Sequence, residues 1–365
     1  MKKVLFAITN LDIGGAEKVL VNLVNNLKND YDITVLTLYN GGQLEETIDK
    51  KVKIKSILNN RYDNMSFISK KLFALKIRMS FFKKKIYKQI NIASYDTVIS
   101  FLEGPITELL KEASNKKIAW IHTDLTEHYP KTKYNRLINV YKKYDELIFV
   151  SQNSLDKFLI IDKDNECKAT KKIIYNYIDE KNILKNSKES IDIEFSKSKN
   201  FVVVARLVEA KGIDRLMMVH KRLIDNGYMH HIYVIGDGPL RIKLEELQKE
   251  YKIEDTFHLL GKKMNPYPYI IKGDYFLLPS YYEGYPVSLI EAEILNQYIL
   301  ITDIASKEVV KDYPNKEIFP NTEEGIYNGL KKIIEEKKIR SKEHYTVTNN
   351  EKIIESIKQL IGGEK

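Results

Sequence analysis

Short runs of apolar, β-branched residues alternate along the chain with longer segments whose apolar residues recur at helical spacing. In the first half these runs occupy residues 3–9, 33–38, 52–57, 97–101, 118–122 and 147–151. The first run is followed by apolar residues that share one helix face, at Val19, Leu20, Leu23, Val24 and Leu27. Buried strands interleaved with amphipathic helices predict a parallel sheet that is covered on both faces.

The same alternation starts again in the second half, after a polar segment. Residues 179–198 are rich in Lys, Asn and Ser and weakly periodic, which is typical of a linker. Strands are then predicted at 201–205, 231–236, 257–260, 275–279 and 299–302, and helices at 213–225, 240–251 and 286–295. A last helix at 351–360 follows a polar break, and we expect it to pack back across the linker.

These patterns predict an α/β protein with two Rossmann-like, doubly wound parallel-sheet domains. The predicted boundaries are 1–178 for the N-terminal domain, 179–198 for the linker, 199–345 for the C-terminal domain and 346–365 for the crossover helix. A length of 365 residues agrees with two domains, because single cores stop growing beyond about 250–300 residues.

Composition narrows the class of protein. Hydrophobic residues make up 43% of the chain and charged residues 30%, which is typical of a globular protein. The single cysteine, Cys167, excludes a disulfide framework and a multi-cysteine metal site, and it fits a reducing cytosol. The first apolar run is too short for a signal peptide, and no stretch has the length of a transmembrane helix. We therefore expect a cytoplasmic protein.

Positive charge is concentrated in the first half of the chain. Residues 1–190 carry 33 Lys and Arg against 23 Asp and Glu, whereas residues 191–365 carry 26 against 27. Residues 51–100 alone hold 12 basic and 2 acidic residues. Such a patch attracts an anionic surface, either phospholipid or nucleic acid.

Segment Lys70–Lys88 lies within this basic patch. It holds eight basic residues and no acidic residue, and apolar residues recur at helical spacing at Leu72, Leu75, Met79, Phe82 and Ile86. This pattern predicts a basic amphipathic helix on the anionic inner face of the cell membrane. The alternative is a helix that packs on its own sheet and exposes a solvated basic face. No nucleic-acid-binding motif accompanies the charge, so we expect no nucleic acid partner.

Two carboxylates follow the predicted strand at 275–279. Glu283 lies in the loop and Glu291 lies eight residues later, in the first turns of the next helix. Ligands of open α/β sheets bind at such strand-to-helix crossovers, so both carboxylates are candidates to contact a substrate. The alternative is an acidic residue in a solvated turn together with an exposed helical Glu.

Two cations and a glycine turn follow other strands of the same predicted domain. Arg206 and Lys211 lie five residues apart beyond the strand at 201–205, where they can hold a diphosphate and neutralise charge on a leaving group. The alternative is a pair of solvated loop cations. Gly236 begins the turn Gly236-Asp237-Gly238-Pro239 after the next strand, and its role is more simply structural.

The first domain offers a glycine pair and a histidine. Gly14 and Gly15 lie between the first strand and the first helix, where a ligand can approach backbone N–H groups; the alternative is a plain loop. The loop is not G-x-G-x-x-G, so a dinucleotide fingerprint is absent. His122 ends the strand at 118–122, where its near-neutral pKa would suit either protonation state, although a lone His is usually structural.

Together these segments resemble the retaining glycosyltransferases of family 4, which have the GT-B fold of two Rossmann domains facing a central cleft. The resemblance rests on four motifs in the family's order, at residues 14–17, 206–212, 236–239 and 279–292. It covers the C-terminal half most fully, and it is weaker in the N-terminal half, where His122 and residues 174–179 also match. The chain departs from the family pattern at Ala205, where Gly is frequent, and at residues 295–298 and 303–308, which lack the usual glycines.

The resemblance implies a role for each residue. Arg206 and Lys211 would hold the diphosphate of a nucleotide-sugar donor, and Glu291 would bind its ribose. Glu283 would contact the transferred sugar, and His122 would line the reaction centre. The remaining donor-binding residues implied by the resemblance are Gly14, Gly15, Gly236, Gly284, Tyr285, Pro286 and Val287.

The implied activity is transfer of a hexosyl or N-acetylhexosaminyl group, with retention of configuration. We expect a UDP-linked donor, a lipid-linked or surface-glycan acceptor as in capsule or exopolysaccharide assembly, and no cofactor or metal. The alternatives are another GT-B activity, such as a nucleotide-sugar epimerase, and a non-enzymatic Rossmann-type binding protein recruited to membranes.

Overall fold

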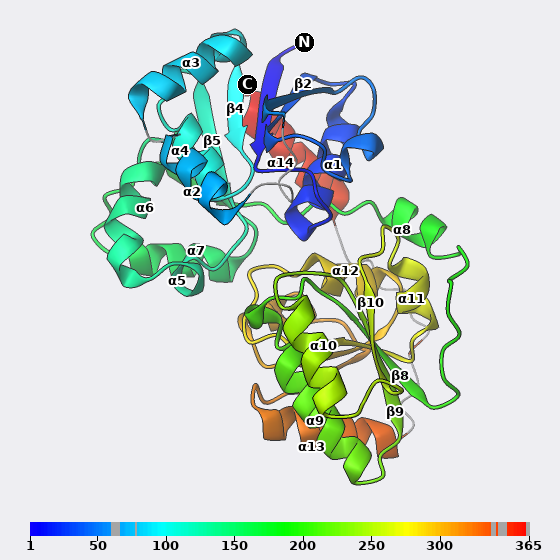
Figure 1. Ribbon diagram of the computed structural model, residues 1–365. Helices are drawn as coiled ribbons and strands as arrows, with labels where there is room; N and C mark the ends of the chain where they lie inside the picture. The colour runs from blue at the N-terminus through cyan, green and yellow to red at the C-terminus, as the bar shows by residue number, and fades with distance from the viewer. Residues whose placement is uncertain (60–65, 77–78, 337–340, 342–348, 363–365) are drawn as a thin grey trace. The chain divides into compact units, whose positions relative to one another are not determined.

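The computed structural model describes residues 1–59, 66–76, 79–336, 341 and 349–362. The chain divides into two compact units, one of Met1–Ile178 with Thr348–Lys365 and one of Asp179–Val347 (Figure 1). Each unit contains a parallel sheet with helices packed against it, so the predicted pair of doubly wound α/β domains is confirmed.

The described part of the first unit holds a seven-stranded sheet in the order β3-β2-β1-β4-β5-β6-β7. All neighbouring strands in it are parallel. The strands are β1 (Lys3–Ile8), β2 (Asp32–Tyr39), β3 (Lys53–Leu58), β4 (Thr97–Ser100), β5 (Lys116–Ile121), β6 (Glu146–Phe149) and β7 (Thr170–Ile173).

Helices α1 (Gly15–Leu27), α2 (Phe67–Lys76), α3 (Ser80–Ile90), α4 (Pro105–Leu110), α5 (Leu125–His128), α6 (Tyr134–Tyr141) and α7 (Gln152–Ile161) belong to the same unit. Helix α1 buries the apolar face that the sequence predicts, including Val19, Leu23 and Leu27. Apolar burial of this kind supplies most of a helix's stability, because short helices are marginal in water.

The second unit holds a six-stranded sheet in the order β10-β9-β8-β11-β12-β13 among its described residues. Its strands are β8 (Lys199–Val204), β9 (His230–Ile235), β10 (Phe257–Gly261), β11 (Tyr275–Leu278), β12 (Tyr298–Thr302) and β13 (Lys316–Phe319). Its helices are α8 (Glu180–Asn186), α9 (Ile213–Asp225), α10 (Arg241–Glu250), α11 (Tyr267–Lys272), α12 (Val287–Ile294) and α13 (Glu323–Glu335). The segment expected to be a linker thus contains α8, which packs against α11 and α12.

The last helix, α14 (Asn350–Gly362), returns to the first unit (Figure 1). Its buried face includes Ile357 and Leu360. Lys116 Nζ donates a hydrogen bond of 2.7 Å to Leu360 O, and Lys358 pairs with Asp30 at 2.8 Å. The predicted return of the C-terminal helix to the N-terminal domain is therefore confirmed.

Segment Lys70–Lys88 does not form one continuous helix, so that prediction is wrong. Helix α2 ends at Lys76, and Met79 adopts an extended conformation with φ −77° and ψ 126° just before α3. The predicted apolar stripe divides accordingly: Leu72 and Leu75 are exposed at 53% and 56%, whereas Ile86 is buried. Residues 77–78 lie outside the described part of the chain.

Both sheets contain a position where the strand order reverses. In the first unit this position lies between β1 and β4, and in the second it lies between β8 and β11. At such a position, the loops that follow the two neighbouring strands run in opposite directions. They leave a crevice between them at the carboxyl edge of the sheet, and open α/β sheets bind ligands in this crevice.

Candidate functional site

The predicted donor-site residues of the second unit follow strands β8, β9 and β11. Arg206 and Lys211 follow β8, Gly236 follows β9, and Glu283 follows β11. Since these three strands are neighbours in a parallel sheet, their loops share one edge, and β8 and β11 form its reversal point. The structure therefore places these residues where the sequence predicted a ligand site.

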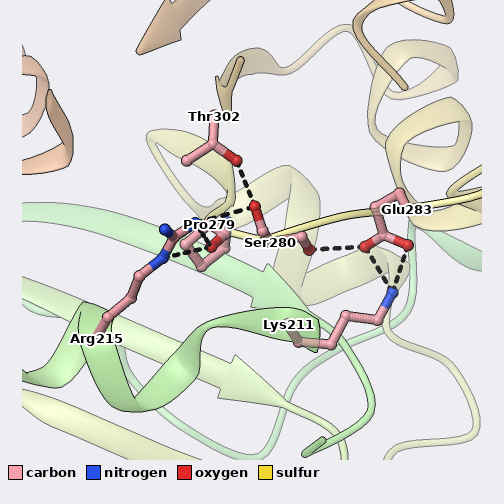
Figure 2. A network of polar contacts seen from close by, with 6 residues as sticks. All are labelled: Lys211, Arg215, Pro279, Ser280, Glu283 and Thr302. Carbon is pink, nitrogen blue, oxygen red and sulfur yellow. Dashed lines mark hydrogen bonds and ion pairs between the residues drawn. The ribbon is translucent and has the colours of Figure 1, made fainter. Parts of the chain in front are cut away.

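Lys211 and Glu283, 72 residues apart in the chain, form an ion pair (Figure 2). The Lys211 Nζ atom lies 2.6 Å from each carboxylate oxygen of Glu283, and the Ser280 hydroxyl donates a third hydrogen bond to Oε1 at 2.7 Å. Glu283 is only 8% exposed, so the carboxylate is held in one orientation by two neighbours rather than by water.

Gly212 explains how the two loops approach each other. It adopts the left-handed conformation with φ +61°, and a Cβ atom at this position would overlap the Pro279 carbonyl oxygen. A further backbone hydrogen bond of 2.8 Å joins Tyr281 N to Ala210 O. A side chain at Gly212 would therefore separate the loop of Lys211 from the loop of Glu283.

Arg215 holds the Glu283 loop from the other side (Figure 2). Its guanidinium donates two hydrogen bonds to Pro279 O, at 3.2 and 2.7 Å, and one to Ser280 O at 3.0 Å. A fourth hydrogen bond of 2.6 Å reaches Asn321 Oδ1. Thr302 Oγ1 also donates to Ser280 O, at 2.6 Å. Because Arg215 is only 2% exposed, its guanidinium is buried, and its hydrogen bonds fix the backbone from which Glu283 projects.

Glu291 lies in α12 and is 3% exposed. The Tyr267 hydroxyl donates to Glu291 Oε1 at 3.1 Å. Burial, followed by the Glu291 carboxylate, raises the pKa of Tyr267 well above its usual value, so this hydroxyl remains a donor. Both Glu283 and Glu291 are buried, and the alternative of a solvated turn with an exposed helical Glu is therefore wrong.

Arg206 differs from Lys211 in having an exposed side chain. In the described residues its guanidinium makes no hydrogen bond or ion pair, so its donors are available to a ligand. Gly236 lies beside it, with φ +149°, and a Cβ atom there would overlap the Ala205 carbonyl oxygen. Gly236 therefore has the structural role that the sequence favoured, because only a glycine allows its backbone to approach Ala205 this closely. The close approach places the Gly236 turn next to Arg206.

The remaining predicted donor-site residues continue from Glu283 into α12. Gly284 and Tyr285 are half-buried in the loop, Pro286 is the N-cap, and Val287 is the first helical residue. All four therefore lie on the segment that joins the two buried carboxylates.

In the first unit, His122 lies directly after β5 and next to Glu103, which follows β4. Glu103 Oε1 accepts hydrogen bonds from the backbone N–H groups of His122 and Thr123, at 2.6 and 2.7 Å. Burial lowers the pKa of His122 to about 4, against an opposing effect of Glu103. The imidazole is therefore neutral at pH 7, and the expectation that either protonation state is accessible there is wrong.

Two buried atoms of this pair lack a partner. Within the described part of the chain, His122 Nε2 and Glu103 Oε2 make no hydrogen bond although both are inaccessible to solvent. Buried polar atoms are rarely left without a partner, and they are frequent at functional sites. Glu103 is thus a candidate that the sequence analysis missed. The available signal was an acidic residue two positions after the predicted strand at 97–101.

Gly14 and Gly15 lie at the start of α1, with Gly14 as the N-cap in an extended conformation. The Glu17 carboxylate lies so close to Gly14 that a Cβ atom there would overlap it. An acidic side chain in the first turn complements the helix dipole. A phosphate that approached these N–H groups would have to displace Glu17, whereas a sugar hydroxyl would not meet the same repulsion.

The described residues contain no group of three or more His, Cys, Asp or Glu side chains arranged to hold a metal ion. The second unit instead offers an exposed Arg206, a Lys211 paired with Glu283, and Glu291 bonded to a tyrosine. Cations of this kind can hold a diphosphate, and buried carboxylates can bind hydroxyl groups.

Comparison with known proteins agrees with this geometry. The family model "Glycosyl transferases group 1" matches residues 185–353. The N-acetylgalactosamine-N,N'-diacetylbacillosaminyl-diphospho-undecaprenol 4-alpha-N-acetylgalactosaminyltransferase of Campylobacter jejuni is 27% identical over 355 residues, which cover 93% of this chain and 92% of that protein. An uncharacterized glycosyltransferase of Methanocaldococcus jannaschii is 28% identical over 207 residues, which cover 54% of this chain and only 51% of that protein.

Among solved structures, HepE of Anabaena, in complex with UDP and glucose, matches with a TM-score of 0.75. The identity is 16%, and the match covers 100% of both chains. The predicted GT-B fold is thereby confirmed. The family model and the sequence relatives also support the broader prediction of a glycosyltransferase.

Proposed function

We propose that the protein transfers a sugar from a nucleotide sugar, most simply a UDP-sugar, to a lipid-linked glycan, with retention of configuration as in family 4. The observation that carries the proposal is the Lys211–Glu283 pair beside an unpaired Arg206, at the strand-order reversal of the second sheet. The relative from Campylobacter jejuni, whose name specifies a diphospho-undecaprenol acceptor, supports the choice of acceptor class.

Donor binding would rearrange the Lys211–Glu283 pair. Lys211 is expected to exchange the carboxylate for the donor diphosphate, which Arg206 also contacts. Glu283 then becomes available to accept hydrogen bonds from hydroxyl groups of the transferred sugar, while Ser280 keeps it in place. Charge that develops on the departing diphosphate would be stabilised by both cations. Glu291 would bind the ribose.

The neutral His122 is expected to line the acceptor side. Since its Nε2 atom has no partner, it can accept a hydrogen bond from a hydroxyl group without first losing a proton. Retention of configuration would follow from departure of the diphosphate and attack on the same face of the sugar. The anomeric proton coupling of the product, measured by NMR, tests retention directly, and an inverted product would refute it.

Segment Lys70–Lys88 is proposed to contact an anionic membrane surface. Exposed apolar side chains accompany its lysines, among them Leu72, Met79 and Phe81, which are 53%, 58% and 80% exposed. Lys83 does not contribute to that surface, because it is 5% exposed and lies 3.7 Å from the Glu108 carboxylate. No helix in the described part is long and apolar enough to cross a membrane. Binding to anionic vesicles that is absent, or insensitive to salt, would contradict this part of the proposal.

The decisive experiment combines donor binding with turnover. A panel of nucleotide sugars is screened by thermal shift, because a bound donor raises the apparent stability of the native protein. UDP release is then measured with and without a lipid diphosphate-linked glycan, in buffer containing EDTA. We expect release that depends on the acceptor and not on a metal.

Each contrary result has a distinct meaning. A sugar that is isomerised without UDP release would indicate an epimerase, and donor binding without any turnover would indicate a binding protein. Loss of activity in EDTA that returns with a divalent cation would contradict metal independence alone.

A further inference from the structure

A cavity of about 210 Å³ lies wholly within the first unit, between α4, α6 and the segment around Tyr129. Its lining begins at Gly104, which directly follows Glu103 at the carboxyl end of β4. The cavity is therefore adjacent to the loop that holds His122, although none of its lining residues belongs to the donor site.

Two tyrosine hydroxyls at this cavity have no hydrogen-bond partner. Tyr129 and Tyr141 both line it, and neither hydroxyl makes a hydrogen bond in the part of the chain that the structure describes. Tyr141 is 2% exposed, and burial raises its pKa well above the usual value, so the hydroxyl remains a donor. Neither hydroxyl is among the solvent-inaccessible polar atoms, so each remains accessible to a ligand with acceptor oxygens.

Tyr144 provides the contrast. Its side chain is as buried as that of Tyr141, but its hydroxyl donates to Thr107 O at 2.7 Å, so it stabilises the fold. The two tyrosines lie three residues apart, in and just beyond α6. Of these two hydroxyls, that of Tyr141 is available to a ligand and that of Tyr144 is not.

Positive charge gathers at the same cavity. The buried carboxylate of Glu108 lies within 4 Å of three cations, at 2.7 Å from Lys111, 3.4 Å from Arg136 and 3.7 Å from Lys83. Of these three cations, Arg136 lines the cavity; Lys133 lines it as well and forms no ion pair among the described residues. Arg136 has five N–H donors, of which Glu108 takes one.

Three carboxylates act on these groups, and Glu108 is the one that lines the cavity. Glu108 is the closest, Glu103 affects both cavity tyrosines, and Glu112 affects Lys83. Among the lining residues themselves, two cations, Arg136 and Lys133, stand against one carboxylate, that of Glu108, which leaves an excess of positive charge and of hydrogen-bond donors. A ligand that matches this lining carries acceptor oxygens and a negative charge.

The volume of the cavity and its apolar lining residues limit the size and type of the ligand further. A volume of 210 Å³ corresponds to about seven water molecules, at roughly 30 Å³ each, which suits a single sugar ring. Leu137, Val140 and the Tyr141 ring give the lining an apolar part on which the C–H face of a sugar can pack.

We propose that this cavity binds an anionic sugar residue, one that carries a carboxylate or a phosphate group. Tyr129 and Tyr141 donate to its hydroxyl or ring oxygens, and Arg136 and Lys133 bind its anionic group. The identification of that residue as part of the acceptor glycan rests on the proposed function.

Ligand-observed NMR titrations of the full-length protein test the site with glucuronate, glucose 6-phosphate, inorganic phosphate and glucose. We expect both anionic sugars to bind more tightly than glucose and than phosphate alone. The tighter of the two identifies the anionic group. Equal affinity for glucose and the anionic sugars, phosphate binding as tight as that of the sugar phosphate, or no binding at all would overturn the proposal.

Two tyrosine variants separate ligand binding from stability. Tyr141→Phe removes a hydroxyl with no protein partner, so the unfolding temperature without ligand should stay at the wild-type value while affinity falls up to about tenfold. Tyr144→Phe should show the opposite pattern, with lower stability and unchanged affinity. Arg136→Met should weaken binding by roughly 10- to 100-fold. Unchanged affinity in Tyr141→Phe and Arg136→Met would refute the site.

These titrations contain no donor and require no turnover. Binding of anionic sugars by a protein that never releases UDP would therefore contradict the proposed function and leave the cavity assignment intact. Acceptor-dependent UDP release by a protein that does not bind anionic sugars would contradict the cavity assignment and leave the proposed function intact.

Discussion

Replacing Arg215 with Met is expected to destabilise the second unit and to reduce sugar transfer. The variant keeps an apolar side chain of similar length but removes every hydrogen bond to Pro279 O and to Asn321 Oδ1. Ser280 O keeps its bond from Thr302, so two acceptors lose a donor. A buried acceptor left unsatisfied costs about 1–3 kcal/mol; this applies in full to Pro279 O and in part to the half-buried Asn321, and removal of the buried charge offsets some of the cost. A loss of about 2–4 kcal/mol results.

The expected loss is measured as a shift in thermal unfolding. For a unit of this size, 1 kcal/mol corresponds to roughly 2–4 °C, so the midpoint should fall by about 5–15 °C. The freed loop also carries Glu283, and a misplacement of 1 Å can lower a rate by about 100-fold. The turnover number should therefore fall even at temperatures where the variant is fully folded, and Arg215→Lys should recover part of it.

Arg222 is the matched control, because it lies in the same helix and its guanidinium lies over the Tyr327 ring, as that of Arg215 lies over the Tyr281 ring. Its ion pair with Glu324 is half-exposed, and such surface pairs contribute little. Arg222→Met should change the midpoint and the turnover number much less than Arg215→Met. Equal effects in the two variants would refute the argument that Arg215 positions the Glu283 loop.

Three further predictions concern single residues. Gly236→Ala should sharply reduce the yield of folded protein, because the new Cβ atom would overlap a backbone carbonyl oxygen. Gly227 also has a positive φ but has open space around it, so Gly227→Ala should lower the free energy of unfolding, measured in urea, by only about 1 kcal/mol. The pKa of His122 is about 4 in the folded protein against 6.5 in the unfolded chain, so the unfolded chain binds a proton first as the pH falls. The free energy of unfolding should therefore be about 3 kcal/mol higher above pH 6.5 than near pH 4 on account of this group. Unfolding titrations should show a shallower pH dependence in His122→Asn, and an unchanged slope would contradict this. Tyr267→Phe removes the hydrogen bond to Glu291 and should raise the donor KM up to about tenfold with little change in turnover number; an unaltered KM would contradict a ribose role.

The sequence patterns predicted most strands of both sheets to within about two residues, together with helices α9, α10, α12 and α14. Strands β7 and β13 were missed, because their sequences, Thr-Lys-Lys-Ile and Lys-Glu-Ile-Phe, contain no apolar run. Both are the last strand at an edge of their sheet, where one side of the strand need not be buried.

The predicted site residues carry chemistry that could be read locally, but their partners come from distant segments. The pairing of Lys211 with Glu283 joins loops 72 residues apart, and no local pattern specifies it. Arg215 has the same origin, because a cation on an amphipathic helix is expected to be solvated, whereas its acceptors come from a loop 64 residues later. Glu103 was missed because its contact with His122 depends on strand order. The contact forms because β4 and β5 are neighbours in the sheet, and the local sequence does not specify that.

The central claim is that Lys211 and Glu283 act on the donor rather than only on each other. Lys211→Met alone leaves a buried carboxylate without its ion-pair partner and should lower both stability and transfer. Lys211→Met combined with Glu283→Gln removes both charges, so stability should return toward that of the wild type. Acceptor-dependent UDP release by this double variant is the most direct test. We predict a rate at least about 100-fold below that of the wild type; a stable double variant that turns over at a near-normal rate would contradict the account.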